Sequence, residues 1–226
     1  MKLVKTLLVS LVFVLANFVF AKIQSIPEPP NLGILKQSIR SYIESGSYER
    51  DIENQINQAI EYLYERVRMK KAEENLAVVF DIDETLLSNL EYEYLYDFGY
   101  NKETWLEWVR QSKAKSIKPS LKLYNLCQKL NISIFIITGR NQLTEELKED
   151  PTVINLKKEG YHSWKKIFFK PINSKMSTTE YKTSCRKEIE SQGYKIILNV
   201  GDQWSDLVGG YSEKIIKLPN PMYYIP

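Results

Sequence analysis

Three short runs of apolar residues, each followed directly by polar side chains, stand out in the hydrophobic pattern of this chain. The runs are residues 76–80, 132–137 and 195–200. Their apolar character is nearly continuous rather than alternating, which is typical of strands buried on both faces of a sheet. Around them, apolar residues recur with the spacing of amphipathic helices. This alternation predicts an α/β fold: a three-layer, mainly parallel sheet with right-handed crossovers.

The same pattern predicts the remaining elements. Helical spacing of apolar residues favours helices over 34–43, 52–67, 123–130, 178–191 and, interrupted by Pro151, 143–156. Two further strands are expected at 166–169 and 214–217, and the proline-rich residues 26–33 suggest an extended surface arm. The chain would thus begin with N-terminal helices and continue into alternating strands and helices.

The segment between the first two strands is longer than a crossover requires. It spans about fifty residues, whereas simple connections of this kind are much shorter. A small helical insert is therefore expected over about residues 88–118, rich in tyrosine and tryptophan. Trp105 and Trp108 are three positions apart, which favours packing in the core. A role in stacking against a substrate is the alternative.

The first 21 residues have the pattern of a secretory signal peptide. Lys2 and Lys5 precede an apolar stretch, and Val19 and Ala21 suit the −3 and −1 positions of a cleavage site. The stretch is short for a membrane span, so a retained anchor is the less favoured alternative. We expect a single mature domain over 22–226, exported to the periplasm or secreted, with no stable membrane anchor after cleavage.

Charge and cysteine content narrow the functional classes. Residues 22–226 carry 28 acidic and 29 of the 31 basic side chains, interspersed rather than gathered into a stripe. A nucleic acid polymer is therefore not an expected partner. Cys127 and Cys185 each lie in a helical pattern, which favours two unpaired buried thiols; a disulfide is the alternative in an oxidising compartment. The oligomeric state is not indicated.

Asp81 and Asp83 follow the first buried strand directly. In an open α/β sheet, ligands bind beyond the carboxyl ends of the strands. A period of two along an extended segment would turn both carboxylates towards one point. Two such carboxylates repel each other unless a cation intervenes, and Mg²⁺ prefers carboxylate and phosphate oxygens. The alternative is that the aspartates merely begin a turn.

The other two buried strands end in comparable polar groups. Residues 132–137 lead into Thr138-Gly139-Arg140, and residues 195–200 lead into Gly201-Asp202-Gln203-Trp204-Ser205-Asp206. Three strands that all end in groups suited to metal and phosphate weaken the turn interpretation. They predict one site at the carboxyl edge of the sheet.

These motifs resemble the haloacid-dehalogenase (HAD) superfamily. Within it, the chain is most similar to the acid phosphatases of subfamily IIIB, the branch that includes plant vegetative storage proteins. The resemblance runs from about Ser45 to Pro226. It is carried by Ser45-Gly46-Ser47-Tyr48, the segment from Asp81 to Asn89, Thr138-Gly139-Arg140, Tyr161-His162-Ser163-Trp164, Tyr181-Lys182-Thr183, the segment from Gly201 to Leu207, and the tail from Leu218 to Ile225.

The resemblance implies a catalytic role for each matched residue. Asp81 would be the nucleophile, forming an aspartyl-phosphate that water then hydrolyses. Asp83 would protonate the leaving alcohol and later activate water; dehalogenases need no such acid. Thr138 and the backbone around Gly139 would hold the phosphoryl oxygens. Lys182 would neutralise charge on Asp81 and on the phosphate.

The resemblance also implies a metal site and a substrate class. Asp202 would complete a Mg²⁺ shell with Asp81 and the main-chain carbonyl of Asp83, and Asp206 would support it directly or through water. Lys175 is the alternative to Lys182 as the lysine that neutralises charge on Asp81 and on the phosphate. The expected substrate is a small phosphomonoester. The alternative function is a storage or binding protein of the same fold with little activity.

Overall fold

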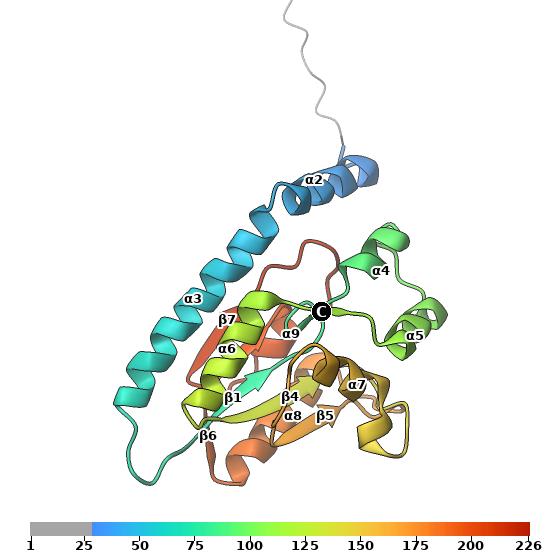
Figure 1. The fold of residues 1–226 in the computed structure, drawn as a ribbon. Helices are drawn as coiled ribbons and strands as arrows, with labels where there is room; N and C mark the ends of the chain where they lie inside the picture. Colours follow the sequence, from blue (N-terminus) through green and yellow to red (C-terminus); the bar gives the residue numbers. More distant parts are fainter. Residues whose placement is uncertain (1–28) are drawn as a thin grey trace, which may run out of the picture. The chain divides into compact units, whose positions relative to one another are not determined.

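A five-stranded parallel sheet forms the centre of the molecule. The computed structural model describes residues 29–226, of which Lys36–Pro226 form one compact unit. The strands lie in the order β5-β4-β1-β6-β7, so β1 is central (Figure 1). Their bounds are β1 (Asn75–Phe80), β4 (Ser133–Thr138), β5 (Lys166–Phe169), β6 (Tyr194–Gly201) and β7 (Lys214–Lys217). The predicted α/β fold with a mainly parallel sheet is confirmed.

Helices cover both faces of this sheet. On one face lie α3 (Ser47–Arg68) and α6 (Lys118–Lys129), which pack on the side chains of Val78, Phe80 and Ile134. On the other face, α8 (Thr178–Ser191) packs on Ala77 and Val79. Successive residues of β1 therefore alternate between two apolar layers, which explains its continuous apolar sequence. Figure 1 shows the resulting three layers.

The two cysteines lie in these different layers. Cys127 of α6 and Cys185 of α8 are both buried free thiols. Cys127 packs in the core on one face of the sheet and Cys185 in the core on the other. The prediction of two unpaired buried thiols is confirmed, and a disulfide between them is excluded by their positions.

Several helix boundaries differ from the sequence-based expectation; α3 and α6, for example, begin at Ser47 and Lys118 rather than at 52 and 123. Helix α2 (Leu32–Glu44) begins two residues earlier than expected, inside the segment assigned to an extended arm. The prediction of a helix over 143–156 interrupted by Pro151 was wrong, because α7 (Pro151–Lys158) begins at that proline. Before it lies only a single 3₁₀ turn, η1 (Leu147–Glu149). Proline suits the first helical turn, and the Asp150 carboxylate caps the helix by accepting the Thr152 N–H at 2.8 Å.

The segment between β1 and α6 forms a small additional layer. It contains β2 (Leu87–Ser88), α4 (Leu90–Leu95), α5 (Lys102–Gln111) and β3 (Lys115–Ser116), with β2 and β3 antiparallel. In Figure 1, α4 and α5 lie beyond the ends of the strands, on the side of the C-terminus. The Tyr92 ring packs against Trp105 and Trp108, with ring centroids 5.3 and 6.2 Å apart. Trp108 is buried in the core, as expected, whereas Trp105 is only half-buried.

The expectations for the N-terminus fall outside this description. The predicted signal peptide and its cleavage site lie before the described residues. Within residues 29–226, no helix is both long and apolar enough to cross a membrane.

Candidate active site

The carboxyl ends of three neighbouring strands bring the predicted site residues to one edge of the sheet. Asp81 follows β1, Thr138 ends β4, and Asp202 follows β6. Because β1 pairs in parallel with both β4 and β6, these three ends lie side by side. The Asp81 N–H continues the ladder by donating to the carbonyl of Val200 at 3.0 Å. The position of Asp81 is therefore fixed by the central strand.

Asp81, Asp202 and Asp206 form a buried carboxylate cluster. One oxygen from each lies within 4.8 Å of the others, and none of the three residues is more than 6% exposed. Lys182, projecting from α8, lies in the same cluster. Its Nζ donates to Asp81 Oδ1 and, at 2.6 Å, to Asp206 Oδ1. One ammonium group thus joins two of three buried acids.

The loop after β6 determines where Asp202 and Asp206 lie. Asp206 belongs to the short helix α9 (Trp204–Leu207), and its Oδ2 accepts the backbone N–H of Gln203 at 2.8 Å. The amides of Gln203 and Asn220 donate to Asp202 Oδ2 at 2.7 and 2.8 Å. Thr85 donates to the other oxygen, Oδ1, at 3.3 Å. Each carboxylate is therefore oriented by hydrogen bonds from neighbouring residues.

Burial disfavours the charged forms of the groups in this cluster. It raises the pKa of the Asp81 carboxyl well above its usual range; Lys182 opposes the shift, whereas Asp206 and Asp202 add to it. Burial, then the charges of Asp206 and Glu84, raise the pKa of Asp202 to about 8. Burial alone would lower the pKa of Lys182, but Asp206 and Asp81 raise it above its ordinary value. Negative charge exceeds positive charge here, so a further cation would stabilise the ionised acids.

The donor set fits a hard divalent ion. All three converging groups are carboxylates, and oxygen ligands of this kind are preferred by Mg²⁺ and similar ions. Asp206 uses one oxygen for Lys182 and the other for the Gln203 N–H. Asp81 and Asp202 each keep an oxygen with fewer hydrogen bonds. The cluster could therefore hold a divalent ion, with Asp81 and Asp202 the better-placed ligands.

The Asp83 carboxylate lies outside this cluster and has its own partners. Arg140 Nη2 donates to Asp83 Oδ1 at 2.6 Å, and Arg140 Nε lies 3.1 Å from both oxygens. The Asn89 amide donates to Oδ1 at 2.8 Å. The Arg140 guanidinium also lies 5.5 Å from the centre of the Trp105 ring. If Asp83 contributes to a metal site, it does so through its main-chain carbonyl, as the resemblance implies.

The two residues expected to hold phosphate lie at the end of β4. Thr138 is fully buried, and its Oγ1 accepts the backbone N–H of Arg140 at 3.1 Å. Gly139 between them is exposed, and a β-carbon built on it would meet no atom within 4 Å. This glycine leaves open space beside its backbone, which suits a site that an anion must approach closely.

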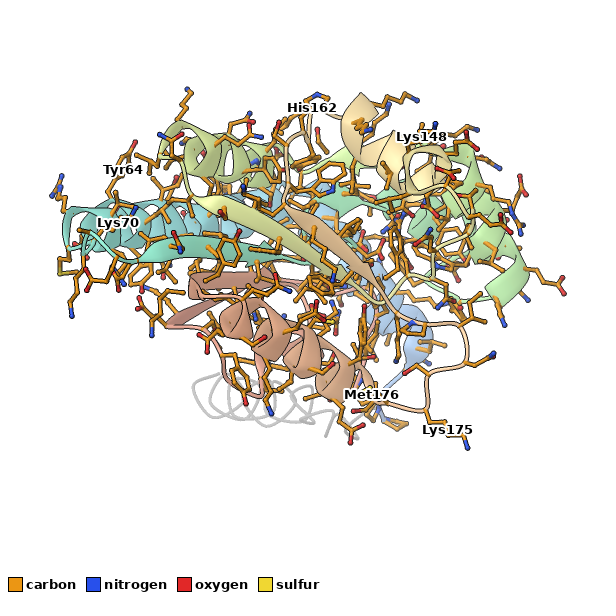
Figure 2. The ribbon with its side chains drawn as sticks, turned by 90° about the horizontal axis from the view of Figure 1, so that it is seen from below. Tyr64, Lys70, Lys148, His162, Lys175 and Met176 are labelled. Carbon is orange, nitrogen blue, oxygen red and sulfur yellow. The ribbon has the colours of Figure 1, made fainter. Side chains whose placement is uncertain are left out.

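The two candidate lysines lie in very different places. Lys182 is 2% exposed and bonded within the carboxylate cluster. Lys175 is exposed on the loop before α8, and Figure 2 shows its side chain pointing away from the molecule beside Met176. Only Lys182 of this pair lies in contact with Asp81.

Several buried polar residues around the site were not assigned a role from sequence. Arg186 is fully buried and donates to the main-chain oxygens of Asp206 and Gly210 at 2.7 and 2.8 Å. Asn199 donates to the same Asp206 oxygen at 3.0 Å. The weak sequence signal for Arg186 is its position one helical turn after Lys182 on the same face of α8.

Comparison with known proteins agrees with the fold. A parallel sheet with an acid-and-lysine cluster at its carboxyl edge is the arrangement that the resemblance implied for a phosphate-ester hydrolase. The chain belongs to the HAD superfamily, subfamily IIIB (acid phosphatase), because residues 27–226 match that family. It is accordingly an enzyme of the acid phosphatase class.

Curated relatives support this assignment, and a solved structure shares the fold. The chain is 36% identical over 196 residues to Stem 28 kDa glycoprotein of Glycine max, covering 84% of this chain and 74% of that protein. It is 35% identical over 193 residues to Acid phosphatase 1 of Solanum lycopersicum, covering 83% and 73%. The fold resembles that of the class C acid phosphatase from Bacillus anthracis with tungstate bound. That comparison gives a TM-score of 0.68 at 22% identity and covers 84% of this chain and 86% of that one.

Proposed function

We propose that this acid phosphatase hydrolyses small phosphomonoesters through an aspartyl-phosphate on Asp81, with the help of Mg²⁺. The observation that carries the proposal is the position of Lys182, whose ammonium group lies between Asp81 and Asp206 in a buried cluster. A buried lysine bonded to a strand-end aspartate neutralises charge at the point where a phosphate must approach. A storage protein would have no need of this costly arrangement.

In the first step, an oxygen of Asp81 attacks phosphorus as the bond from phosphorus to the ester oxygen breaks. Asp83 donates a proton to the departing ester oxygen, so that an alcohol leaves. In the second step, water attacks the same phosphorus atom and gives a proton to Asp83. The bond from phosphorus to Asp81 breaks, which releases inorganic phosphate and restores both carboxyl groups.

Other residues of the chain would hold the phosphoryl group during these steps. The hydroxyl of Thr138 and the backbone N–H groups around Gly139 would donate to its oxygens, and Lys182 would offset its charge. The open space beside Gly139 supports this role, because the phosphate can approach the backbone there without a clash. Arg140 has another role, since its guanidinium is occupied by Asp83.

Asp81, Asp202 and the main-chain carbonyl of Asp83 would hold the Mg²⁺ ion. Such an ion supplies positive charge that offsets repulsion between a phosphate dianion and a carboxylate. Asp206 would act indirectly, because both of its oxygens are engaged by Lys182 and Gln203. This choice among the acids follows from the hydrogen bonds already present in the cluster.

The enzyme would work outside the cytoplasm. The basic and apolar pattern of residues 1–21 supports cleavage before Lys22 and export to the periplasm or secretion. The intact mass of the exported protein would test this, because retention of Met1 would favour an anchored form.

A panel of phosphomonoesters tests the proposed function directly. Nucleoside, sugar and aryl phosphates would be offered to the purified chain 22–226 with Mg²⁺, then with EDTA, and then with Mg²⁺ restored. Turnover that is lost with EDTA and recovered with Mg²⁺ is the expected result. The Asp81→Asn protein, purified in the same way, controls for contaminating phosphatases. Absence of turnover on every ester in the presence of Mg²⁺ would favour a storage protein.

A further inference from the structure

Asn89 is a buried residue whose side-chain amide links Asp83 and Glu84 to the helical insert. It is fully buried at the start of α4. Its Nδ2 donates to Asp83 Oδ1 at 2.8 Å and to Glu84 Oε2 at 3.0 Å. Its backbone N–H donates to Glu84 Oε1 at 2.6 Å. The amide nitrogen therefore faces two acids at once.

The amide oxygen of Asn89 faces the insert. It accepts the indole N–H of Trp108 at 2.9 Å and lies 3.5 Å from Arg140 Nη2. Trp108 is 7% exposed and comes from α5. An indole N–H can only donate a hydrogen bond, so it cannot accept one from the NH₂ group of a flipped Asn89 amide. With the amide reversed, the Asn89 oxygen would face Asp83 and Glu84, and its NH₂ group would face the Trp108 N–H.

We propose that Trp108 and Asn89 are positioning residues for the general acid of this enzyme. The Trp108 indole fixes the orientation of the Asn89 amide, and that amide fixes the Asp83 carboxyl group. This inference rests on the proposed function, in which Asp83 protonates the leaving group. It gives the insert a part in the chemistry, although neither α4 nor α5 supplies the nucleophile.

The geometry also distinguishes the two oxygens of Asp83. Oδ1 accepts from Asn89 at 2.8 Å and from Arg140 Nη2 at 2.6 Å. Oδ2 has a single longer contact, with Arg140 Nε at 3.1 Å. Oδ1 is therefore saturated with donors, and Oδ2 is the oxygen that can carry the proton. Loss of the Asn89 contact would let the carboxyl group rotate and move that proton away from the ester oxygen.

The leaving group of the substrate provides the test. A good leaving group such as p-nitrophenolate departs without protonation, whereas an alkoxide such as that of glycerol 2-phosphate needs a proton from Asp83. Trp108→Phe removes the indole N–H and keeps an aromatic ring. We expect kcat/KM for glycerol 2-phosphate to fall roughly 10- to 100-fold. For p-nitrophenyl phosphate it should fall less than about threefold, with KM little changed.

Trp164→Phe is the matched control, because Trp164 is half-buried and packs on the same core. It precedes the amino end of β5, whereas Asp83 follows the carboxyl end of β1. Trp164→Phe should leave the ratio of the two kcat/KM values unchanged. Equal losses on both esters in Trp108→Phe, or no loss on either, would overturn the proposal. If Trp108→Phe fails to fold, benzothienylalanine at position 108 removes the N–H alone, and the same two outcomes apply.

Asp83→Asn separates failure of this inference from failure of the proposed function. It should show the same selective loss on glycerol 2-phosphate, and to a greater extent. If Asp83→Asn shows this selective loss and Trp108→Phe does not, only the positioning role of Trp108 and Asn89 fails. If Asp83→Asn itself shows no selectivity between the two esters, Asp83 is not the leaving-group acid, and the inference falls with it.

Discussion

Gly201 lies directly against Asp206. A β-carbon built on Gly201 would lie 2.6 Å from the Cβ and 2.7 Å from the Oδ2 of Asp206. Gly201 ends β6, and its missing side chain lets α9 fold back over the strand end. Asp206 can then reach Lys182. A glycine is therefore required at position 201 for steric reasons, because a β-carbon there would prevent Asp206 from lying so close to the backbone.

Gly201→Ala should lower both the stability and the activity of the enzyme. Overpacking of this kind costs typically about 1–3 kcal/mol in the free energy of unfolding. Displacement of Asp206 should also lower kcat. Gly139→Ala is the control, because a β-carbon there would meet no atom within 4 Å. It should melt like the parent protein but raise KM by occupying the phosphate approach. Denaturant titration should give a lower free energy of unfolding for Gly201→Ala than for Gly139→Ala, and steady-state kinetics should show the changes in kcat and KM. Equal free energies of unfolding for the two variants would contradict the steric role of Gly201.

Asp81→Asn should abolish turnover and leave the fold intact. An amide cannot act as the nucleophile, and loss of a nucleophile in other enzymes lowers kcat by at least about 10³-fold. The circular dichroism spectrum and melting temperature should stay close to those of the parent protein. Full activity in the variant would refute the aspartyl-phosphate mechanism.

Lys182→Met should impair both stability and catalysis, whereas Lys175→Met should impair neither. Lys182 is buried and bonded to Asp81 and Asp206, so its removal leaves buried carboxylates without a counter-ion. Loss of one partner from such a cluster costs about 3–5 kcal/mol. Lys175 is exposed, and its substitution changes only a solvated surface. Urea unfolding at neutral pH and the kcat of each variant would distinguish the two lysines. A stable, active Lys182→Met protein would contradict their assignment.

Asp202 and Asp206 should differ in their effect on metal dependence. Asp202→Asn should raise the Mg²⁺ concentration for half-maximal activity by at least about 10-fold, since changes even in outer groups of metal sites have effects of that size. Asp206→Asn should shift it less, because both Asp206 oxygens are already occupied. Mg²⁺ binding measured by calorimetry should follow the same order. Activity that survives exhaustive chelation in metal-free protein would show that the site has another chemistry.

Glu93 should make stability depend on pH in the metal-free protein. Burial, and then the charge of Asp83, raise the pKa of Glu93 from 4.5 to about 7. The folded protein then keeps a proton that the unfolded chain releases, so the free energy of unfolding should fall as pH rises from about 4.5 to about 7. Glu93→Gln should flatten this slope. Glu91→Gln, an exposed change on the same helix, should retain it. Identical slopes for the parent and Glu93→Gln would contradict this source of the effect.

The sheet could be predicted from sequence because its central strands are buried on both faces. Residues 76–80, 132–137 and 195–200 are continuous apolar runs, and the polar residues after them lie at one edge for topological reasons. The same reasoning failed near Pro151. Leu147 has helical spacing with its neighbours but is 42% exposed, so the apolar pattern there does not follow the core.

The polar support of the site could not be predicted in the same way. Asn89 and Arg186 are both fully buried, whereas such residues are usually exposed. Their burial is tolerated because partners far along the chain satisfy them, such as the Trp108 N–H for Asn89 and the Gly210 carbonyl for Arg186. No local pattern in the sequence encodes such distant pairs.

The central place of β1 also constrains when the enzyme can first act. Val78 of β1 pairs with Ile134 on one side and with Leu198 on the other. A ribosome adds residues in order, so Asp81 is made long before either neighbouring strand. A half-synthesised chain would carry the proposed nucleophile without Lys182 or Asp202 beside it. Under the proposed mechanism, the growing polypeptide would therefore hydrolyse no phosphate esters until β6 has been made.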